Sequence, residues 1–303
     1  MDLKTTLSKM PILSLATFGA FLEATGTILE RIVLKKHKID SKDYTVFQFL
    51  TIVLSAIPIF LILSHIFPQA FSWKISSEAL EFKNILIFFI IIFFSILGNL
   101  LIFHAMKWEK LTELEPIRLS QPLFIILLAF IIYSSERQTA MPILIAALIA
   151  SIALIFSHLK KHHLQFNKYA LAALFGSFSF AVEMVLSKSL LPYYSPLSIY
   201  FVRSLIILII CALIFKPNIN SANRKSWYYI SLTGFIWVLY RGILYYSYTL
   251  EGVIFTTLMF LLTPVFIYLF SRIYLKEKLN WRNIIASIII VLCVLYALII
   301  NSS

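Results

Sequence analysis

Long apolar runs alternate with short polar connectors along the whole chain. A helix crosses about 30 Å of hydrocarbon with about 20 residues, and the pattern predicts ten such helices. The longest connector, residues 67–82, contains Trp73 and Lys74, and we expect it to lie along the membrane interface. The predicted spans are residues 11–34, 45–66, 83–106, 112–133, 140–159, 167–190, 197–216, 227–249, 252–274 and 281–300.

The composition supports this pattern. Of the 303 residues, 60% are hydrophobic and 13% are charged, which is too apolar for a soluble domain of this size and indicates a multi-pass integral membrane protein. The formal net charge is +12, and most Lys and Arg residues lie in the connectors, where they meet lipid headgroups. No basic patch is interleaved with aromatic residues, so we expect membrane lipids as partners and no nucleic acid.

Sequence motifs for enzymatic chemistry are missing. The chain has seven glycines and contains no phosphate-binding glycine loop, nucleophile motif or zinc motif. His162 and His163 sit in a Lys-rich connector without further ligands, and Cys211 and Cys293 fall within apolar runs. We therefore expect no enzyme, no ATP-driven pump, no cofactor and no bound metal.

The two halves of the chain resemble each other. Aligning Gln121-Pro122-Leu123-Phe124 with Thr263-Pro264-Val265-Phe266 also places Glu109 over Glu251 without a gap. Further blocks align with gaps, among them Ser-Glu-Arg with Lys-Glu-Lys just before the last span of each half. These matches divide the chain near residue 163 into two sets of five spans.

An odd number of spans in each half gives the halves opposite orientations in the membrane. The predicted fold is therefore all-α, with ten transmembrane helices as two inverted five-helix repeats, residues 1–162 and 163–303. Inverted repeats suit alternating access to a binding site near the membrane midplane.

On these residues the chain resembles the EamA-type branch of the drug/metabolite transporter superfamily. Arg203 fits the family's second-helix arginine in the later half, whereas Gln48 occupies that place in the earlier half. Pro122 and Pro264 fit the fourth-helix proline of each repeat, but the turns before the fifth helices lack the family's glycine. The resemblance implies a transporter whose first, fourth, sixth and ninth helices surround a cavity, in a prokaryotic inner membrane. We expect a monomer or a homodimer.

Polar side chains within the predicted spans are the candidates for function, because a charged group at a helix centre costs roughly 2.5–3.5 kcal/mol on insertion. They form stripes at helical spacing on several spans. The candidate substrate-binding or coupling residues are Glu23, Thr27, Glu30, Arg118, Gln121, Glu183, Arg203, Trp237, Arg241 and Tyr245.

The two midspan acids each have a structural alternative. We expect Glu23 to face a hydrated cavity opposite an arginine or a substrate amine, where it could carry a proton and couple transport to a proton gradient. The alternative is a permanent Glu–Arg pair that only joins two helices. For Glu183 the two possibilities weigh equally, because Lys188 is one turn away.

The three midspan arginines also have a functional and a structural interpretation. The spacing favours an ion pair of Arg118 with Glu115, whereas Arg241 has no acid at helical spacing within its span and is expected to contact substrate. Arg203 lies near a helix start, within reach of either a substrate or lipid headgroups. For the aromatic residues Tyr245–Tyr248, an interfacial belt is slightly favoured over a stacking wall.

The sequence thus predicts a secondary transporter for a small polar metabolite, such as an amino acid or another zwitterion. The alternatives are a multidrug or cation exporter of the same superfamily, a membrane-embedded enzyme acting on lipid headgroups, and a lipid-carrier flippase. Orientation stays open. Seventeen Lys and Arg residues fall on the side opposite the termini and six on the termini side, which favours external termini, whereas the family resemblance favours internal ones.

Overall fold

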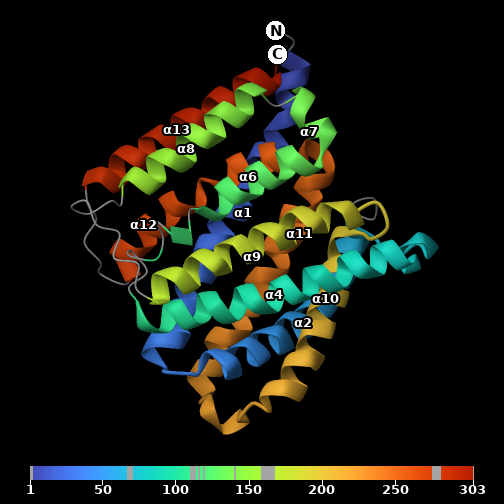
Figure 1. Ribbon diagram of the computed structural model, residues 1–303, viewed down its shortest axis with the longest axis vertical. Helices are drawn as coiled ribbons and strands as arrows, with labels where there is room; N and C mark the ends of the chain where they lie inside the picture. The colour runs from blue at the N-terminus through green and yellow to red at the C-terminus, as the bar shows by residue number, and fades with distance from the viewer. Residues whose placement is uncertain are drawn as a thin grey trace.

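The structure is a computed structural model that describes residues 3–66, 71–109, 114, 117–118, 120–139, 141–157, 168–274 and 281–302. Within these ranges every regular element is a helix, as Figure 1 shows. The elements are α1 (Leu3–Arg31), its π-helical extension η1 (Ile32–Lys36), α2 (Ser41–Ile66), η2 (Ser77–Leu80), α4 (Phe82–Trp108), α6 (Ser120–Ile132), α7 (Ser134–Thr139), α8 (Met141–Ser157), α9 (Lys168–Leu190), α10 (Pro196–Phe215), η3 (Ile219–Ser221), α11 (Arg224–Phe260), α12 (Thr263–Tyr274) and α13 (Trp281–Ser302).

The long helices have apolar outer surfaces that suit a lipid environment. Among the described residues, α2, α4, α9, α10 and the continuous stretch Arg224–Tyr274 are long and apolar enough to cross a membrane. Large apolar side chains cover their outer faces, and Leu61 and Leu213 are 64% and 71% exposed. A helix satisfies its own backbone hydrogen bonds, so such surfaces are stable against hydrocarbon. The chain is a multi-pass integral membrane protein.

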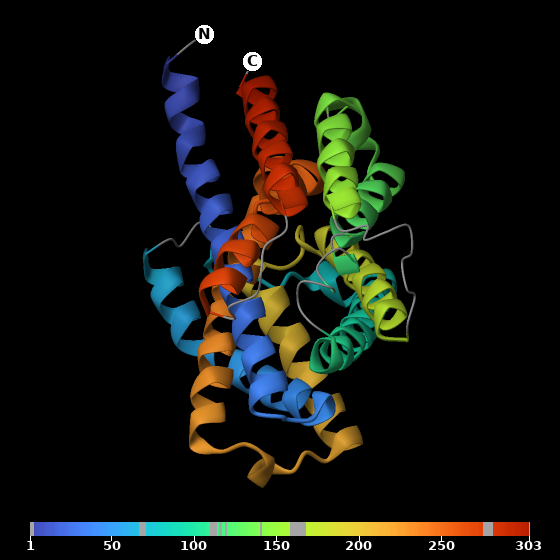
Figure 2. The ribbon, with the colours of Figure 1, turned by 90° about the vertical axis from the view of Figure 1, so that its left-hand side faces the viewer.

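The helices form a bundle in which both ends of the chain lie at the same end. Figures 1 and 2 show the start of α1 and the end of α13 close to each other, with α8 running alongside α13. The described part of the longest connector, residues 71–81, lies against the turn between α9 and α10. Ser76 N donates to Tyr193 O at 2.9 Å, and Ser195 N donates to Lys74 O at 3.1 Å, which ties the connector to the turn between α9 and α10.

Helix packing pairs the two halves of the chain. The first helix of the first half, α1, packs on α11 and α12, and the first helix of the second half, α9, packs on α4 and α6. The fifth and tenth predicted spans, α8 and α13, pack on each other. These principal contacts between the two halves therefore match when the halves are exchanged.

The predicted spans 227–249 and 252–274 meet at a break within α11. Helix α11 runs from Arg224 to Phe260, and its one described non-helical residue is Gly252, at φ 82° and ψ 176°. A second interruption follows at Leu261 and Leu262, just before Pro264, which has no backbone N–H to continue the helix. The ninth span is consequently a discontinuous helix.

Local sequence explains where two helices begin. The Ser195 hydroxyl accepts a hydrogen bond from Ser198 N at 3.3 Å, and Pro196 takes the first helical position of α10. Asn223 caps α11 by accepting from Ser226 N at 2.8 Å. The predicted fourth span, 112–133, is described as a helix from Ser120 to Ile132, preceded by Ile117 and Arg118.

Candidate functional site

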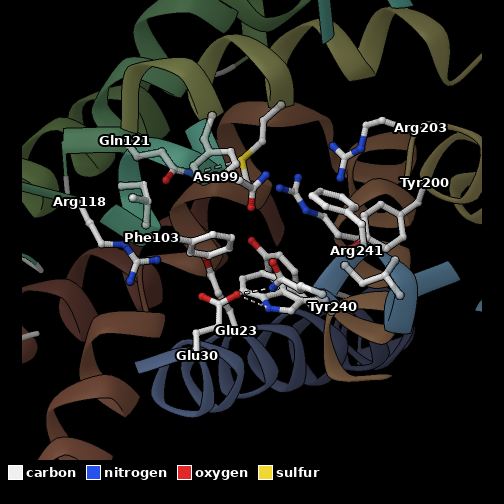
Figure 3. Close-up of a pocket in the computed structure, with 17 residues that line it drawn as sticks. Glu23, Glu30, Asn99, Phe103, Arg118, Gln121, Tyr200, Arg203, Tyr240 and Arg241 are labelled. Carbon is white, nitrogen blue, oxygen red and sulfur yellow. Dashed lines mark hydrogen bonds between the residues drawn. The ribbon is translucent and has the colours of Figure 1, made fainter. Parts of the chain in front are cut away.

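A cavity of about 560 Å³ lies at the centre of the bundle. Its lining side chains come from α1, α2, α4, α9, α10 and α11 and from the segment that leads into α6, and Figure 3 shows them around the opening. They are Glu23, Glu30, Gln48, Phe49, Ile52, Asn99, Ile102, Phe103, Arg118, Gln121, Phe180, Met184, Tyr200, Arg203, Trp237, Tyr240 and Arg241.

Two arginines at this cavity share one buried acid. Arg203 Nη1 donates to Glu183 Oε1, and Arg241 Nη2 lies 3.2 Å from Glu183 Oε2. The Tyr245 hydroxyl donates to the same carboxylate at 2.9 Å. Glu183 is fully buried and does not line the cavity, whereas both guanidinium groups do. This cluster, Glu183–Arg203–Arg241, therefore places one excess positive charge against the cavity.

Two N–H donors of this cluster have no hydrogen-bond partner among the described residues. They are Arg203 Nε and Arg241 Nη1, and both are buried. The guanidinium carbon of Arg203 also lies 4.9 Å from the ring centroid of Tyr200, and that of Arg241 lies 5.7 Å from the ring of Tyr240. The aromatic faces hold the guanidinium planes, so the remaining N–H groups are available to an anionic ligand.

The two acids of α1 lie on another side of the same cavity, as Figure 3 shows. Glu30 is 3% exposed and accepts hydrogen bonds from Gln48 Nε2 and, at 2.8 Å, from Trp237 Nε1. Glu23 accepts from the Thr263 hydroxyl at 2.7 Å. All three donors are neutral.

The polar residue of the second helix differs between the two halves of the chain. Arg203 of α10 binds the acid Glu183 of α9, and the corresponding Gln48 of α2 binds the acid Glu30 of α1. In each half a side chain of the second helix thus binds an acid of the first helix, but that side chain is a cation only in the second half. In the first half the cation that acts on the two acids of α1 is Arg118, which lines the same cavity.

A second cavity of about 540 Å³ adjoins the first, between α1, α6, α11 and α12. Both cavities are lined by Glu23, Arg118, Gln121, Met184 and Tyr240, so these five residues form the boundary between them. Gln121 Nε2 lies 3.4 Å from Met184 Sδ across that boundary.

The structure brings together nine of the ten candidate residues, either as cavity lining or as members of the cluster around Glu183. Glu23, Glu30, Arg118 and Gln121 line the first cavity with Arg203, Trp237 and Arg241. Glu183 and Tyr245 lie behind the arginines and bind them. Thr27 is fully buried and does not line the cavity.

Several sequence-based pairings change in the structure. Lys188 binds Glu136 and not Glu183, and Arg203 is 2% exposed and turned away from headgroups. Tyr245 and Tyr248 are buried, not an interfacial belt, because Tyr245 donates to Glu183 and Tyr248 lines the second cavity inside the bundle. The expected pairing of Arg118 with Glu115, the histidines 162 and 163 and the turn 276–278 lie outside the described residues.

Residues that the sequence did not single out also line the cavity. Asn99 is the clearest, because it is a polar residue in the middle of the apolar helix α4, and its side chain donates to Ser95 O at 2.7 Å. Tyr200 and Phe103 give no such signal, since aromatic residues are common throughout the spans. Among the described residues, no group of three or more His, Cys, Asp or Glu side chains is placed to hold a metal ion.

Comparison with known proteins supports this architecture. A solved protein, described only as "Crystal structure of protein", superimposes with a TM-score of 0.66 at 16% identity, covering 96% of each chain. That likeness concerns the fold alone. No curated protein gives a significant match. The model of the EamA-like transporter family matches residues 167–299, in the second half of the chain, in agreement with the resemblance to EamA-type drug/metabolite transporters.

Proposed function

We propose that the chain is a secondary transporter of a small zwitterionic metabolite, such as an amino acid, and that the central cavity is its binding site. The carboxylate of the substrate binds Arg203 and Arg241, and its ammonium group binds Glu23 and Glu30. The observation that carries the proposal is the separation of charge: two arginines share the single acid Glu183, whereas both α1 acids accept only from neutral donors in their described hydrogen bonds.

The arginine cluster makes a zwitterion a better fit than a simple cation. A cation exporter needs acids at its site, but it gains nothing from two buried guanidinium groups with unpaired N–H donors facing the cavity. Burying those groups costs free energy that an anionic ligand would offset. An anion alone, in turn, leaves Glu23 and Glu30 without a partner cation from the ligand.

Alternating access follows from the arrangement of the helices in this proposal. We infer ten spans in two inverted repeats, residues 1–162 and 163–303. The inference is supported by the exchange of partners between α1 and α9, and by the packing of α8 on α13. Rocking of one repeat against the other would expose the cavity to each side in turn, and the discontinuous ninth span at Leu261–Leu262 lies beside it.

Proteoliposome counterflow tests the binding site. Vesicles loaded with an unlabelled amino acid mixture are assayed for uptake of each labelled amino acid with the wild type, Glu23→Gln and Arg241→Ala. We expect each variant to lose at least tenfold in uptake. Arg224→Ala, at the exposed start of the same helix, and Glu81→Gln, at the exposed start of α4, are the matched controls and should retain uptake. Wild-type uptake that persists in both site variants would contradict the proposal.

Proton coupling is a further part of the proposal and rests on Glu23. This acid is half-buried, lies at the boundary of both cavities and is held by the neutral Thr263 hydroxyl. An imposed pH gradient should drive net transport by the wild type. Glu23→Asp should retain this coupling, whereas any transport left in Glu23→Gln should be exchange that ignores the gradient.

A further inference from the structure

The second cavity contains two hydroxyl groups that have no partner apart from each other. Tyr248 and Thr257 line it and are 2% and 4% exposed, and among the described residues their hydroxyls interact only with one another, so at least one O–H donor is left unpaired. The other two hydroxyls of this cavity belong to Thr263, which donates to Glu23 at 2.7 Å, and to Tyr240, which also interacts with Glu23. A buried hydroxyl without a partner is unfavourable, so the pair of Tyr248 and Thr257 is placed where a ligand can complete it.

The rest of the second cavity is mostly apolar. Ile125, Leu244, Phe260 and Ile267 line it beside the two hydroxyls. These apolar side chains can contact methylene or methyl groups of a ligand. The hydroxyls of Tyr248 and Thr257 can each donate and accept a hydrogen bond at the polar part of the cavity wall. The cavity therefore fits a neutral substituent that combines a short alkyl chain with a hydrogen-bonding group, such as a hydroxyl or a carboxamide.

The position of Glu23 connects this cavity to the proposed substrate site. Glu23 lines both cavities, so a substrate whose ammonium group binds Glu23 has its remaining substituent at the boundary formed with Met184 and Tyr240. The substrate carboxylate extends toward Arg241 in the first cavity, and the side chain extends into the second.

We propose that the second cavity is a side-chain subsite that selects zwitterions carrying a neutral hydroxyl or carboxamide group, and that Tyr248 and Thr257 determine this preference. The proposal rests on the proposed function of the central cavity. Its physical basis is general: a site built to hydrogen-bond a polar group rejects the apolar isostere strongly, because the buried polar groups of the protein are then left unpaired.

Isosteric pairs of amino acids test the subsite. Threonine and valine have nearly the same shape, as do glutamine and methionine, so each pair differs mainly in hydrogen bonding. Half-saturating concentrations are measured in proteoliposome exchange, and thermal stabilisation of the purified protein gives a second reading of binding. We expect the wild type to favour the polar member of at least one pair by about tenfold, which corresponds to about 1.4 kcal/mol.

The variants Tyr248→Phe and Thr257→Val remove one hydroxyl each and keep the shape. Each should reduce the preference to about threefold or less, mainly through weaker binding of the polar member. Thr256→Val is the matched control, because Thr256 is 1% exposed and its hydroxyl has no partner among the described residues, but it lines neither described cavity. The preference should survive in this control.

The outcomes separate the two proposals. Exchange of amino acids with no preference within either pair would overturn the subsite and leave the zwitterion site standing. A preference that persists in both Tyr248→Phe and Thr257→Val, or that falls equally in Thr256→Val, would also overturn it. If no amino acid is exchanged and none stabilises the protein, the proposed function and the subsite fail together.

Discussion

Glu136 and Gly252 lie against each other at the break in α11, although 116 positions separate them along the chain. A Cβ atom on Gly252 would stand 2.7 Å from Glu136 Oε1, which is closer than real Cβ contacts allow. The carboxylate occupies this space because it accepts hydrogen bonds from the next two backbone N–H groups, Val253 at 2.7 Å and Ile254 at 3.1 Å. Glu136 thereby caps the helical segment that restarts after the break.

The break requires glycine for two independent reasons. At φ 82° and ψ 176° an L side chain is strained, and the Cβ would also displace the Glu136 carboxylate. We therefore expect Gly252→Ala to lower the melting temperature of the purified protein clearly, by the equivalent of about 2 kcal/mol or more. Gly242→Ala is the control in the same helix, because its Cβ would meet only the tip of the Leu197 side chain, at 3.1 Å. A Gly252→Ala variant as stable as this control would contradict the account.

Removing the cap should expose the restarted helix. In Glu136→Ala the buried amides of Val253 and Ile254 lose their acceptors, and we expect their hydrogen exchange to accelerate at least tenfold. Lys188→Met removes the cation that binds Glu136 but leaves both amide bonds, so it is the matched control. Peptide-resolved exchange in detergent measures both. Equal acceleration in the two variants would show that the ion pair, not the cap, holds this segment.

The sequence predicted the helices well, because a run of about 20 apolar residues has few other structures available to it in a membrane. The break at Gly252 falls where the eighth and ninth predicted spans meet. What holds the break was not predictable, because the acid that accepts from Val253 N and Ile254 N comes from α7. The interpretation of the aromatic run was wrong because Tyr245 and Tyr248 are buried in the bundle, and spacing along one helix does not show this.

The sequence named most of the polar side chains that line the cavity, but it did not predict how they are connected. Helical spacing relates residues three or four positions apart, so it offered Lys188 as a partner for Glu183. The actual partners, Arg203 and Arg241, are 20 and 58 positions away on other helices. Such contacts depend on how the helices pack, and no local pattern carries that information.

Substitutions of Glu183 and Glu23 should have different effects on stability and on transport. Replacing Glu183 by Gln leaves two buried guanidinium groups with no acid between them, which typically costs 3–5 kcal/mol for a buried pair. We expect a large drop in the melting temperature. Glu23→Gln keeps an acceptor for the Thr263 hydroxyl and should change the melting temperature little while reducing uptake at least tenfold. If the two variants were equally stable, the arrangement of charges around Glu183 would be wrong.

The surface ion pair between Lys107 and Asp40 predicts how the stability of the protein depends on pH. Lys107 Nζ lies 2.8 Å from Asp40 Oδ1, and this hydrogen bond from Lys107 is the main reason that the pKa of Asp40 falls below its ordinary value of 3.8. A lowered pKa in the folded state stabilises the protein above pH 3.8, and this stabilisation disappears as the pH falls through the folded pKa.

The effect is small because the Asp40 side chain is 54% exposed and water screens the pair. Asp40→Asn should lower stability at pH 7 by no more than about 1 kcal/mol, and the difference from the wild type should vanish at a pH well below 3.8. Thermal unfolding across pH measures it, and 1 M salt at pH 7 should also reduce it. A difference that grows on acidification would have the wrong sign.

Gln48 provides the sharpest distinction between a structural and a functional role for the α1 acids. Gln48→Arg restores at this position the cation that Arg203 supplies in the second half. The new guanidinium would meet Glu30 where Gln48 Nε2 already donates to it, with the first cavity available for the longer side chain. If Glu30 served only to join α1 to α2, this stronger pair would leave transport intact.

In the proposed site the outcome is the opposite, because Glu30 contributes part of the negative charge that binds the substrate ammonium group. We expect Gln48→Arg to fold, to melt at the same temperature as the wild type or higher, and to lose at least tenfold in affinity for a zwitterion in the exchange assay. Gln48→Leu is the control, since it removes the donor without adding charge and should cost some stability but less affinity. Wild-type affinity in Gln48→Arg would show that the negative charge at Glu30 takes no part in binding.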